Sequence, residues 1–453
     1  MNKNIFNLSS EEKIQFIEDC YSREITNEEV SLLSELLKDK DKGVRNSVSF
    51  FFINSDHELV PFKVVEYVKS SDTSIRNMAG DILLKKGADS VTALLNFIDL
   101  GNADDKKFCI DILGLIGNQE ACPKIISELE KSQNDNLTLA CLEALGNLKC
   151  PEIEKIVAPI YNKNELFKPT IIEAFGKAGS DEVIQFLIDV FDEEDELIKY
   201  AIIESLGLIG KPETVNFLLG RIKSESYVLV GPVVNSIYQL VNKYNLECTS
   251  SDQVIEKIVA ASDFIDQNHS MAAVSFLANH INEDVMFVFY KLFGKDFDVD
   301  MVIRQVFDNN LEPFLTLLSS YLAIPNNNTM DLLNYFKEII YVSPEIVRNV
   351  CESPNSRLTN SIVKLLSNKT DEIRAIAAEI ILAIDPISGI ENVDKLLNDQ
   401  NVWNRMGYLE NFASVLIPFP EEFVKIFLND RDEMVKERAL TLLKEHNLSL
   451  SGA

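Results

Sequence analysis

Residues 72–87, DTSIRNMAGDILLKKG, decide the fold of this chain. Asp72 suits the N-cap of a helix, because its carboxylate can accept hydrogen bonds from the free N–H groups of the first turn. Apolar residues follow at helical spacing: Ile75, Ala79, Ile82 and Leu83. Gly87 suits the left-handed position just past the C-terminus. The stretch therefore predicts an amphipathic helix, and its apolar stripe needs a neighbouring helix to cover it.

The same helix recurs about every 31 residues, which is the period of a helical repeat. The cap column reads Asp41, Asp72, Asn102, Asn134, Asn164 and Asp195. Four residues past each cap stands a mostly basic column: Arg45, Arg76, Lys106, Thr138, Lys168 and Lys199. Seven past the cap stands an apolar column: Val48, Ala79, Cys109, Cys141, Ile171 and Ile202. The columns share one register and predict helices near residues 42–54, 73–86, 103–116, 135–148, 165–178 and 196–209.

The pattern Asp-x-x-Ile-Arg-x-x-Ala of residues 72–79 resembles HEAT repeats, as does LGLIG at residues 113–117 and again at 206–210. Among HEAT subtypes it is most similar to the short repeat named after phycobilisome lyases, well over residues 30–245 and moderately over 355–453. The resemblance implies an all-α fold, an α-α superhelix in which helix pairs stack as a HEAT-type solenoid. It also implies that the second helix of each pair lies inside the curve and that the cap and basic columns stabilise the fold.

We predict three segments along the chain. Residues 1–245 form an N-terminal repeat array, and its opening helices, 9–20 and 27–37, cover the end of the stack. Residues 351–453 form C-terminal repeats, in which Thr370, Asn401 and Asp432 restore the cap column. The segment between them, 246–350, loses the register but keeps a helical pattern rich in Phe and Tyr. It consists either of divergent helix pairs or of an inserted helical subdomain.

The charge of the chain narrows the choice of partner. Asp and Glu number 71 against 43 Lys and Arg, which gives a formal net charge of −28. Phosphate backbones and anionic membrane surfaces attract basic proteins, so we expect no nucleic acid and no membrane as partner. A protein with a basic surface fits this charge. An acidic surface that only keeps a solenoid soluble fits it equally well.

The seven cysteines are scattered without a CxxC motif, and Cys109 and Cys141 fall in the apolar column. They are expected to be small core residues in a reducing compartment. The N-terminal sequence MNKNIFNLSSEEK has no apolar run long enough for a signal peptide, and no stretch approaches the length of a membrane span. These observations predict a cytoplasmic protein.

A column of carboxylates stands nine residues past the caps. It reads Asp81, Asp111, Glu143, Glu173 and Glu204, and then Glu379 and Glu410 in the C-terminal repeats. At about 100° per residue this position points away from the packed core. If the second helices line the concave side, the groove is acidic and binds a basic partner. The alternative is a solvated face, although lysine would serve that purpose and does not occur in the column.

Other residues share this face or border it. Leu139, Leu197 and Tyr200 place apolar groups beside the acids. A glycine column stands twelve past the caps, at Gly114, Gly146, Gly176 and Gly207, and indicates either close helix packing or close approach of a ligand. The only tryptophan, Trp403, stands two past Asn401, and Met434 stands two past Asp432. With Glu410 they have the composition of a binding hot spot, unless Trp403 is buried.

Catalytic motifs are absent from the sequence, which has only four dispersed histidines and no phosphate-binding or nucleophile motif. We therefore predict a non-catalytic scaffold that binds a protein with a basic or mixed basic-apolar surface and needs no cofactor or metal. The predicted contact residues are Asp81, Asp111, Glu143, Glu173, Tyr200, Glu204, Glu379, Trp403, Glu410 and Met434. The alternatives are an accessory enzyme or lyase-type subunit with a small-molecule pocket in the aromatic segment, and an architectural homo-oligomer.

Overall fold

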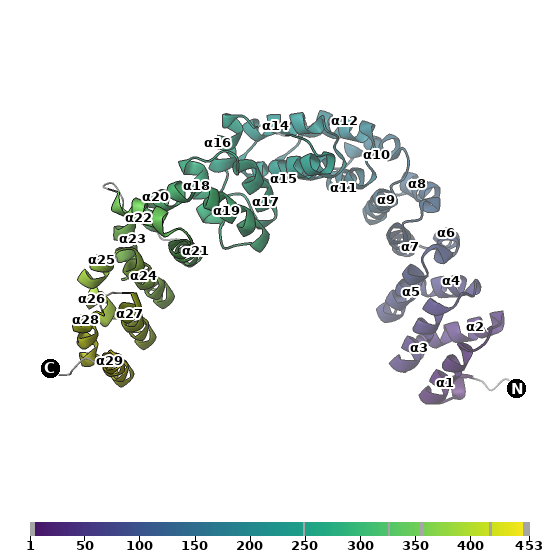
Figure 1. The fold of residues 1–453 in the computed structure, drawn as a ribbon. Coiled ribbons are helices and arrows are strands. Elements are labelled where there is room, and N and C mark those ends of the chain that lie inside the picture. Colours follow the sequence, from purple (N-terminus) through teal and green to yellow (C-terminus); the bar gives the residue numbers. More distant parts are fainter. Residues whose placement is uncertain (1–4, 248–249, 325–326, 354–356, 416–418, 447–453) are drawn as a thin grey trace. The chain divides into compact units, whose positions relative to one another are not determined.

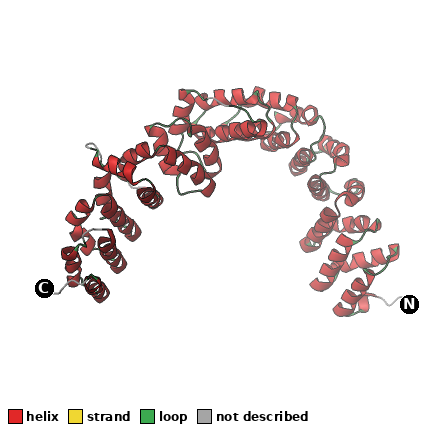
Figure 2. Ribbon diagram, in the orientation of Figure 1, coloured by secondary structure: helices red, strands yellow, loops and turns green. Residues whose placement is uncertain are grey.

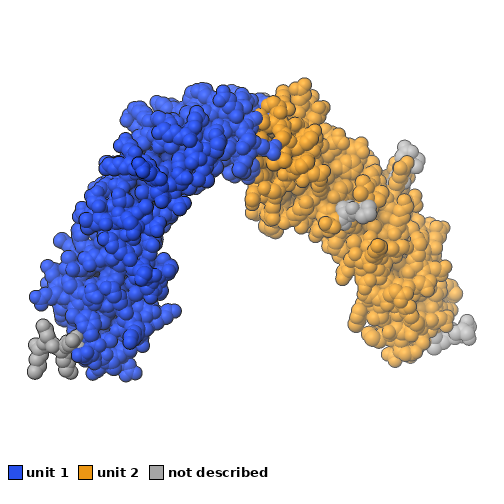
Figure 3. All heavy atoms as spheres, turned by 180° about the vertical axis from the view of Figure 1, so that it is seen from behind, with its two compact units in different colours: residues 1–221, 236–248 blue, residues 222–235, 249–453 orange. Residues whose placement is uncertain are grey.

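The computed structural model describes residues 5–247, 250–324, 327–353, 357–415 and 419–446. Every element in these ranges is a helix, and none of the described residues forms a strand (Figures 1 and 2). The chain divides into two compact units (Figure 3). Unit 1 contains residues 1–221 and 236–248, and unit 2 contains residues 222–235 and 249–453. The segment boundaries at 245 and 350 stay a prediction.

Unit 1 is built of helix pairs, and within it the first and the second helices of the pairs form two rows (Figure 1). The first helices are α2 (Asn27–Glu35), α4 (Leu59–Val64), α6 (Val91–Ile98), α8 (Cys122–Lys131), α10 (Ile153–Tyr161) and α12 (Asp181–Val190). The second helices are α3 (Lys42–Asn54), α5 (Thr73–Lys86), α7 (Ala103–Ile116), α9 (Asp135–Asn147), α11 (Lys168–Ala178) and α13 (Glu196–Ile209). The six predicted helices are confirmed.

Helix α1 (Ser10–Cys20) packs against α3 at the N-terminal end, and Ser9 and Glu12 form the predicted capping box. Short 3-10 turns extend or join the helices of the chain: η1 (Ile5–Asn7), η2 (Leu36–Lys38), η3 (Val65–Lys69), η4 (Gly87–Ser90), η5 (Gln119–Ala121), η6 (Glu165–Phe167), η7 (Phe191–Glu193) and η8 (Phe427–Asn429).

Unit 2 continues the alternation with less regular lengths. Its first-row helices are α16 (Asp252–Ala260), α18 (Glu283–Leu292), α20 (Leu311–Leu322), α22 (Pro344–Glu352), α23 (Leu358–Leu365), α25 (Pro386–Glu391), α26 (Val393–Leu397) and α28 (Glu421–Ile426). Its second helices are α17 (Gln267–Leu277), α19 (Phe297–Asn309), α21 (Thr329–Val342), α24 (Asp371–Ile384), α27 (Val402–Val415) and α29 (Glu433–Glu445). Helices α14 (Thr214–Ser224) and α15 (Tyr227–Tyr244) each contribute residues to both units, and α15 runs on through Pro232.

The second helices stack because each buries an apolar stripe against its neighbours. In α9, Leu137, Cys141, Ala144 and Leu145 are all buried, at the positions that the period assigns to the core. Helix α9 packs against α7 on one side and α11 on the other, and α11 packs against α13. Each repeat therefore depends on its sequence neighbours for burial, as in other solenoids.

The aromatic segment of unit 2 buries its rings against one another. Tyr290, Phe307, Phe314 and Tyr335 form a mutual cluster with centroid separations of 4.6–5.6 Å. The hydroxyl of Tyr290 donates to the Phe314 carbonyl at 2.5 Å, and burial raises the pKa of this tyrosine. These aromatic residues form a core inside unit 2.

A disulfide joins Cys122, at the start of α8, to Cys150, just after α9, with Cα atoms 5.9 Å apart. The expectation that the cysteines are free core thiols is therefore wrong for this pair. Spacing could not reveal the bond, because the cysteines stand 28 positions apart in the sequence and are brought together only through the α8–α9 packing. Cys20, Cys109 and Cys141 are free and buried, as expected, and burial raises the pKa of the Cys109 and Cys141 thiols to about 12.

Removal of this crosslink is expected to destabilise unit 1. Closing a 28-residue loop stabilises a fold by about 3.5 kcal/mol in the chain-entropy model. The double variant Cys122→Ala/Cys150→Ala should lower the thermal midpoint, measured by circular dichroism, and a dithiol reductant should do the same to the wild type. The reductant should leave the double variant unchanged. Equal midpoints for the oxidised and reduced wild type would contradict a stabilising disulfide.

Most caps of the second helices act as predicted, but Thr370 makes no side-chain cap hydrogen bond to α24, and Asn164 caps the short turn η6 instead of α11. An Asp72 oxygen accepts from the backbone N–H groups of Ser74 at 2.8 Å and Ile75 at 3.4 Å, and Asn102, Asn134 and Asp195 cap their helices in the same way. Gly87 has φ 58°, a conformation that side chains disfavour.

Asp72→Ala should therefore lower the free energy of unfolding by about 1 kcal/mol, within the usual range of about 0.5–2 kcal/mol for a lost cap. Thermal unfolding followed by circular dichroism measures the change. Glu143→Ala removes an exposed acid from the middle of α9 and should have little effect. Equal midpoints for Asp72→Ala and the wild type would mean that the cap is dispensable.

Candidate functional site

The free face is defined here as the surface of the second helices turned away from the first helices. The predicted carboxylate column lies on it in unit 1. Asp81, Glu143, Glu173 and Glu204 are exposed, and Asp111 is half-buried. In the repeat before Asp81, the equivalent position is occupied by Phe50 of α3, which is 64% exposed. Residue 50 stands nine past the cap Asp41, so the period alone predicts its outward position, which a column defined by acidic residues leaves out.

Lysines of the same helices neutralise part of the column. Lys85, Lys107 and Lys177 pair with Asp81, Asp111 and Glu173 at 3.0, 2.7 and 2.7 Å, each across one helical turn. No ion pair is found for Glu143 or Glu204 within the described parts of the chain. Within the column of unit 1, the carboxylates without an ion pair are therefore those of α9 and α13.

Exposed leucines flank these carboxylates. On α13, Leu197 is 72% exposed and Leu208 is 59% exposed, with Glu204 between them. Leu115 of α7 is also exposed, whereas Leu139 and Tyr200 are half-buried. The free face of unit 1 is therefore mixed acidic and apolar.

The C-terminal carboxylates of the column are both paired. Glu379 of α24 lies against Lys337 of α21, and Glu410 of α27 accepts two hydrogen bonds from one edge of the Arg438 guanidinium of α29. The Oε2···Nη2 distance of the second pair is 3.0 Å. These carboxylates connect neighbouring second helices, so their charge is already balanced within unit 2.

The glycine column serves helix packing. A Cβ added to Gly146 would lie 2.5 Å from Cα of Ala174, and one added to Gly114 would lie 3.0 Å from Cα of Ala144. Gly176 and Gly207 face Ser205 and Ser236 in the same way. Both serine hydroxyls donate to carbonyls of the preceding second helix, at 3.0 and 2.8 Å. Of the two explanations that the sequence allowed, close packing of successive second helices is the one observed.

Two glycine-to-alanine changes separate packing from helix propensity. In an open helix, alanine stabilises by about 1 kcal/mol relative to glycine, and Gly220 of α14 has open space around it. Gly220→Ala should therefore raise the free energy of unfolding. Gly146→Ala should lower it by about 1–2 kcal/mol, because overpacking outweighs the gain in propensity. Urea titrations compare the two variants, and stabilisation by both would show that the α9–α11 contact has room for a methyl group.

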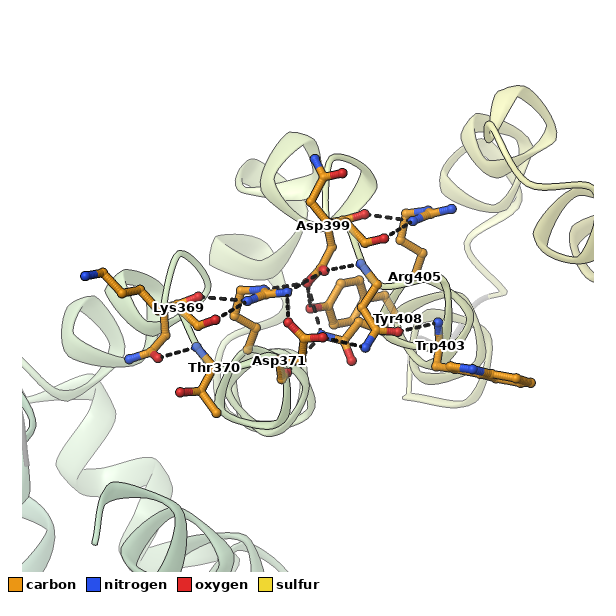
Figure 4. A network of polar contacts seen from close by, with 12 residues as sticks. Lys369, Thr370, Asp371, Asp399, Trp403, Arg405 and Tyr408 are labelled. Atoms are coloured by element: carbon orange, nitrogen blue, oxygen red, sulfur yellow. Dashed lines mark hydrogen bonds and ion pairs between the residues drawn. The ribbon is translucent and has the colours of Figure 1, made fainter. Parts of the chain in front are cut away.

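Trp403 lies on the surface of α27, with 67% of the residue exposed. Its backbone N–H donates to the Asn401 side chain at 2.9 Å, and its ring points away from the polar network beneath (Figure 4). Met434 of α29 is also exposed, at 47%. Burial, the alternative considered for Trp403, is therefore excluded, while its role in binding stays a prediction.

The network under Trp403 shows what the basic column does. Arg374 binds the Asp399 carboxylate through two nitrogens, each at 2.8 Å, and Arg405 binds Asp430 at 2.8 and 3.0 Å (Figure 4). In both cases an arginine four residues past one cap reaches an aspartate two residues before the next cap. Lys13 and Asp39 repeat this arrangement at the N-terminus, at 2.8 Å. At these positions the basic residue connects consecutive repeats, whereas Arg45 donates to the carbonyls of Asp39 and Lys40 in front of its own helix.

Asp399 stays ionised in this network. Burial alone raises the pKa of its carboxyl group, but donors from Arg374, from the Asn401 backbone and from the Asn404 and Tyr408 side chains outweigh it. Together they hold the pKa well below its usual range. The network thus contributes to stability at neutral pH, and that contribution is lost as pH falls below the ordinary aspartate range.

The aromatic segment holds an open hollow of about 300 Å³. It is lined in part by Val259, Phe287, Lys291 and Tyr321, and most neighbouring rings are packed into the core. In the described ranges, no three His, Cys, Asp or Glu side chains are placed to hold a metal ion, and no helix is long and apolar enough to span a bilayer. The closed apolar pocket that would favour a small-molecule function is not seen in this hollow.

Comparison with protein families supports the repeat assignment. A family model described as HEAT repeats matches residues 153–230, the stretch from α10 into α15. The chain contains HEAT repeats. The helix pairs before and after this stretch have the same alternation of first and second helices, as a helical solenoid requires. The subtype named after phycobilisome lyases stays a prediction.

Other structures align along most of the chain at low similarity. Importin beta, from a crystal grown in an ammonium sulfate condition, aligns with 93% of this chain and 70% of its own, at 11% identity and a TM-score of 0.43. A homology model of the full-length AP-3 complex aligns with 98% of this chain and 95% of its own, at 12% identity and a TM-score of 0.40. The crystal structure of Kap121p bound to Pho4p aligns with 98% of this chain and 65% of its own, at 10% identity and a TM-score of 0.37. A comparison with curated proteins finds no match to the sequence.

Proposed function

We propose that this chain is a non-catalytic scaffold that binds a partner protein through the free face of its second helices. The observation that carries the proposal is the combination of unpaired carboxylates on α9 and α13 with exposed leucines on α13. Glu143 and Glu204 are exposed without an ion pair in the described parts of the chain, and Leu197 and Leu208 expose apolar surface to water. A partner with a basic or mixed basic-apolar surface satisfies both.

Energetics support the mixed character of this partner. Exposed ion pairs contribute only about 0–1 kcal/mol each, so the carboxylates alone would steer and orient a partner more than hold it. Burial of leucine surface adds about 25 cal/mol per Å² that leaves water. The leucines therefore supply affinity, and Glu143 and Glu204 select a partner of opposite charge.

The remaining predicted contact residues fall into two groups. Asp81, Asp111, Glu173 and Tyr200 belong to the free face of unit 1, where the three acids are paired with lysines and contribute less. Glu379, Trp403, Glu410 and Met434 belong to unit 2, where Trp403 and Met434 offer an exposed apolar contact area. The excess of 71 acidic over 43 basic residues supports a partner other than nucleic acid or an anionic membrane.

The cytoplasmic location stays a prediction. Disulfides persist mainly in oxidising compartments, so the redox state of Cys122 and Cys150 in the native cell is the observation that bears on it.

Charge reversal tests the free face. The double variant Glu143→Lys/Glu204→Lys and the quadruple variant Asp111→Lys/Glu143→Lys/Glu173→Lys/Glu204→Lys should lose the proteins that immobilised wild type retains from extracts of the native cell, identified by mass spectrometry. The double variant should lose nearly as much as the quadruple variant, because it removes the unpaired charges. Binding should also weaken as salt rises, since charges separated by more than about 8–10 Å are screened at physiological ionic strength.

A matched control for the quadruple variant reverses four exposed acids on the first-helix side of unit 1. Its substitutions are Glu120→Lys, Glu130→Lys, Glu182→Lys and Glu193→Lys. It should retain the partners, and all variants should keep the helical signal of the wild type. Equal retention of partners by the double variant and the wild type would mean that the carboxylate column serves solubility and not binding.

A further inference from the structure

The turn after α9 lacks the glycine that ends three of the neighbouring second helices. Gly87, Gly117 and Gly179 stand fifteen positions past the cap column, at the ends of α5, α7 and α11, and each has a positive φ. The equivalent residue after α9 is Lys149, and its φ is 50°. Glycine adopts this left-handed conformation readily, whereas a side chain disfavours it. The fold therefore holds Lys149 in a conformation that costs free energy.

Backbone hydrogen bonds at the end of α9 require this conformation. The Lys149 N–H donates to the Gly146 carbonyl at 3.0 Å. The Cys150 N–H donates to the Leu145 carbonyl at 3.2 Å, which completes a Schellman motif. From η5, the Gln119 side chain donates to the Lys149 carbonyl at 3.0 Å. The end of α9 is thus closed by a motif in which a lysine takes the place of glycine.

A second strained residue lies on the other side of Cys150. Glu152, at the N-cap of α10, has φ 54°, and its side chain caps no backbone N–H of that helix. Within the described ranges, the residues other than glycine with a positive φ are Lys149, Glu152 and Asn245. Two of these three flank Cys150, and Asn245 follows α15. Backbone strain is therefore concentrated in the turn that carries the disulfide.

The Cys122–Cys150 disulfide ties this turn to the start of α8. Both cysteines are buried, whereas Lys149, Pro151 and Glu152 are exposed, so a thiol reaches the bond only when the turn opens. A thiolate released at Cys122 lies at the N-terminus of α8, where the helix dipole favours negative charge. Cys122 is therefore the better leaving group, and an attacking thiol bonds to Cys150.

We propose that the Cys122–Cys150 bond is a redox switch that keeps the turn of residues 149–152 in its strained form. Two molecules of a thiol, glutathione in the test below, reduce it. The first attacks Cys150 as a thiolate and expels Cys122, and the second releases Cys150 by forming the disulfide of the reductant. The two cysteines gain two electrons and two protons, and the reductant loses them.

Breaking the bond lets Lys149 and Glu152 leave the left-handed region. The end of α9 and the start of α10 then open, while the other helices of unit 1 stay stacked. Because the strain is released on reduction, this disulfide is easier to reduce than one in a relaxed turn. The inference does not depend on the proposed function.

Equilibration of the full-length protein with mixtures of reduced and oxidised glutathione tests the switch. Free thiols are alkylated after an acid quench, and mass spectrometry measures the ratio of oxidised to reduced Cys122–Cys150 pairs. Lys149→Gly and Glu152→Gly each relieve strain that exists only in the oxidised form, so this ratio should rise about five-fold in each variant. Asn245→Gly changes a positive-φ residue outside the turn and should leave the ratio unchanged.

Hydrogen exchange followed by mass spectrometry tests the opening of the turn. On reduction, the N–H groups of Lys149 and Cys150 should exchange at least ten-fold faster. The N–H of Gly117, which ends α7 and donates to the Leu113 carbonyl at 3.2 Å, should keep its rate. In Lys149→Gly the end of α9 should stay protected in both redox states, because glycine keeps the left-handed conformation without the bond.

An unchanged glutathione ratio in either glycine variant would overturn the switch, because the turn would then be equally strained with and without the bond. Reduction that leaves the exchange of Lys149 and Cys150 unchanged would overturn it as well. The same holds if reduction abolishes the helical signal of the protein, because the bond would then be a crosslink on which folding depends.

Discussion

Each second helix of this chain buries its apolar stripe only because another helix lies beside it. The stripe of α9 is covered from both sides, by α7 and α11, and no single helix pair could cover it alone. This constraint accounts for the repetition of the sequence. It also accounts for the small residues between successive second helices, since Gly146 and Ala174 must meet almost backbone to backbone for the stripes to close.

Polar groups join the repeats in a second way. Where an arginine or lysine four residues past a cap reaches an aspartate before the next cap, the pair is nearly excluded from water, as Arg405 and Asp430 are, each with a side chain 2% exposed. Such a pair stabilises the fold only when every remaining donor is satisfied. Arg405 meets that condition by also donating to the carbonyl of Asp399 at 2.7 Å. These buried pairs connect consecutive repeats, and on the free face only Glu143 and Glu204 of the carboxylate column have no ion pair within the described residues.

The parts of the structure that depend on local sequence were predictable. The helix at 73–86 was marked at both ends, by Asp72 and Gly87, and its observed limits agree with the prediction. The pairing of Lys107 with Asp111 is also local, because the two residues stand one helical turn apart. It is therefore readable from the sequence, although a column defined by its acids alone does not include it. The Cys122–Cys150 bond and the Glu410–Arg438 pair depend on tertiary packing, which spacing does not encode.

The same distinction applies to the candidate site. Sequence periodicity could place Trp403 on the outward side of its helix, but only the packing of the neighbouring helices shows that nothing covers it. The purpose of a glycine is likewise invisible in the sequence. Gly146 and Gly407 both lie inside a continuous helix, and the structure alone shows that one has a neighbour and the other has open space.

The disulfide has a mechanical consequence for unit 1. A solenoid pulled from its ends lengthens as its helices unravel one after another, and each freed residue adds about 3.3–3.6 Å of contour length. The residues between Cys122 and Cys150 lie inside a covalent loop whose ends are held 5.9 Å apart. The fully stretched oxidised chain is therefore roughly 90 Å shorter than the fully stretched reduced chain. Unfolding of α9 therefore adds no length to the chain while the disulfide is intact.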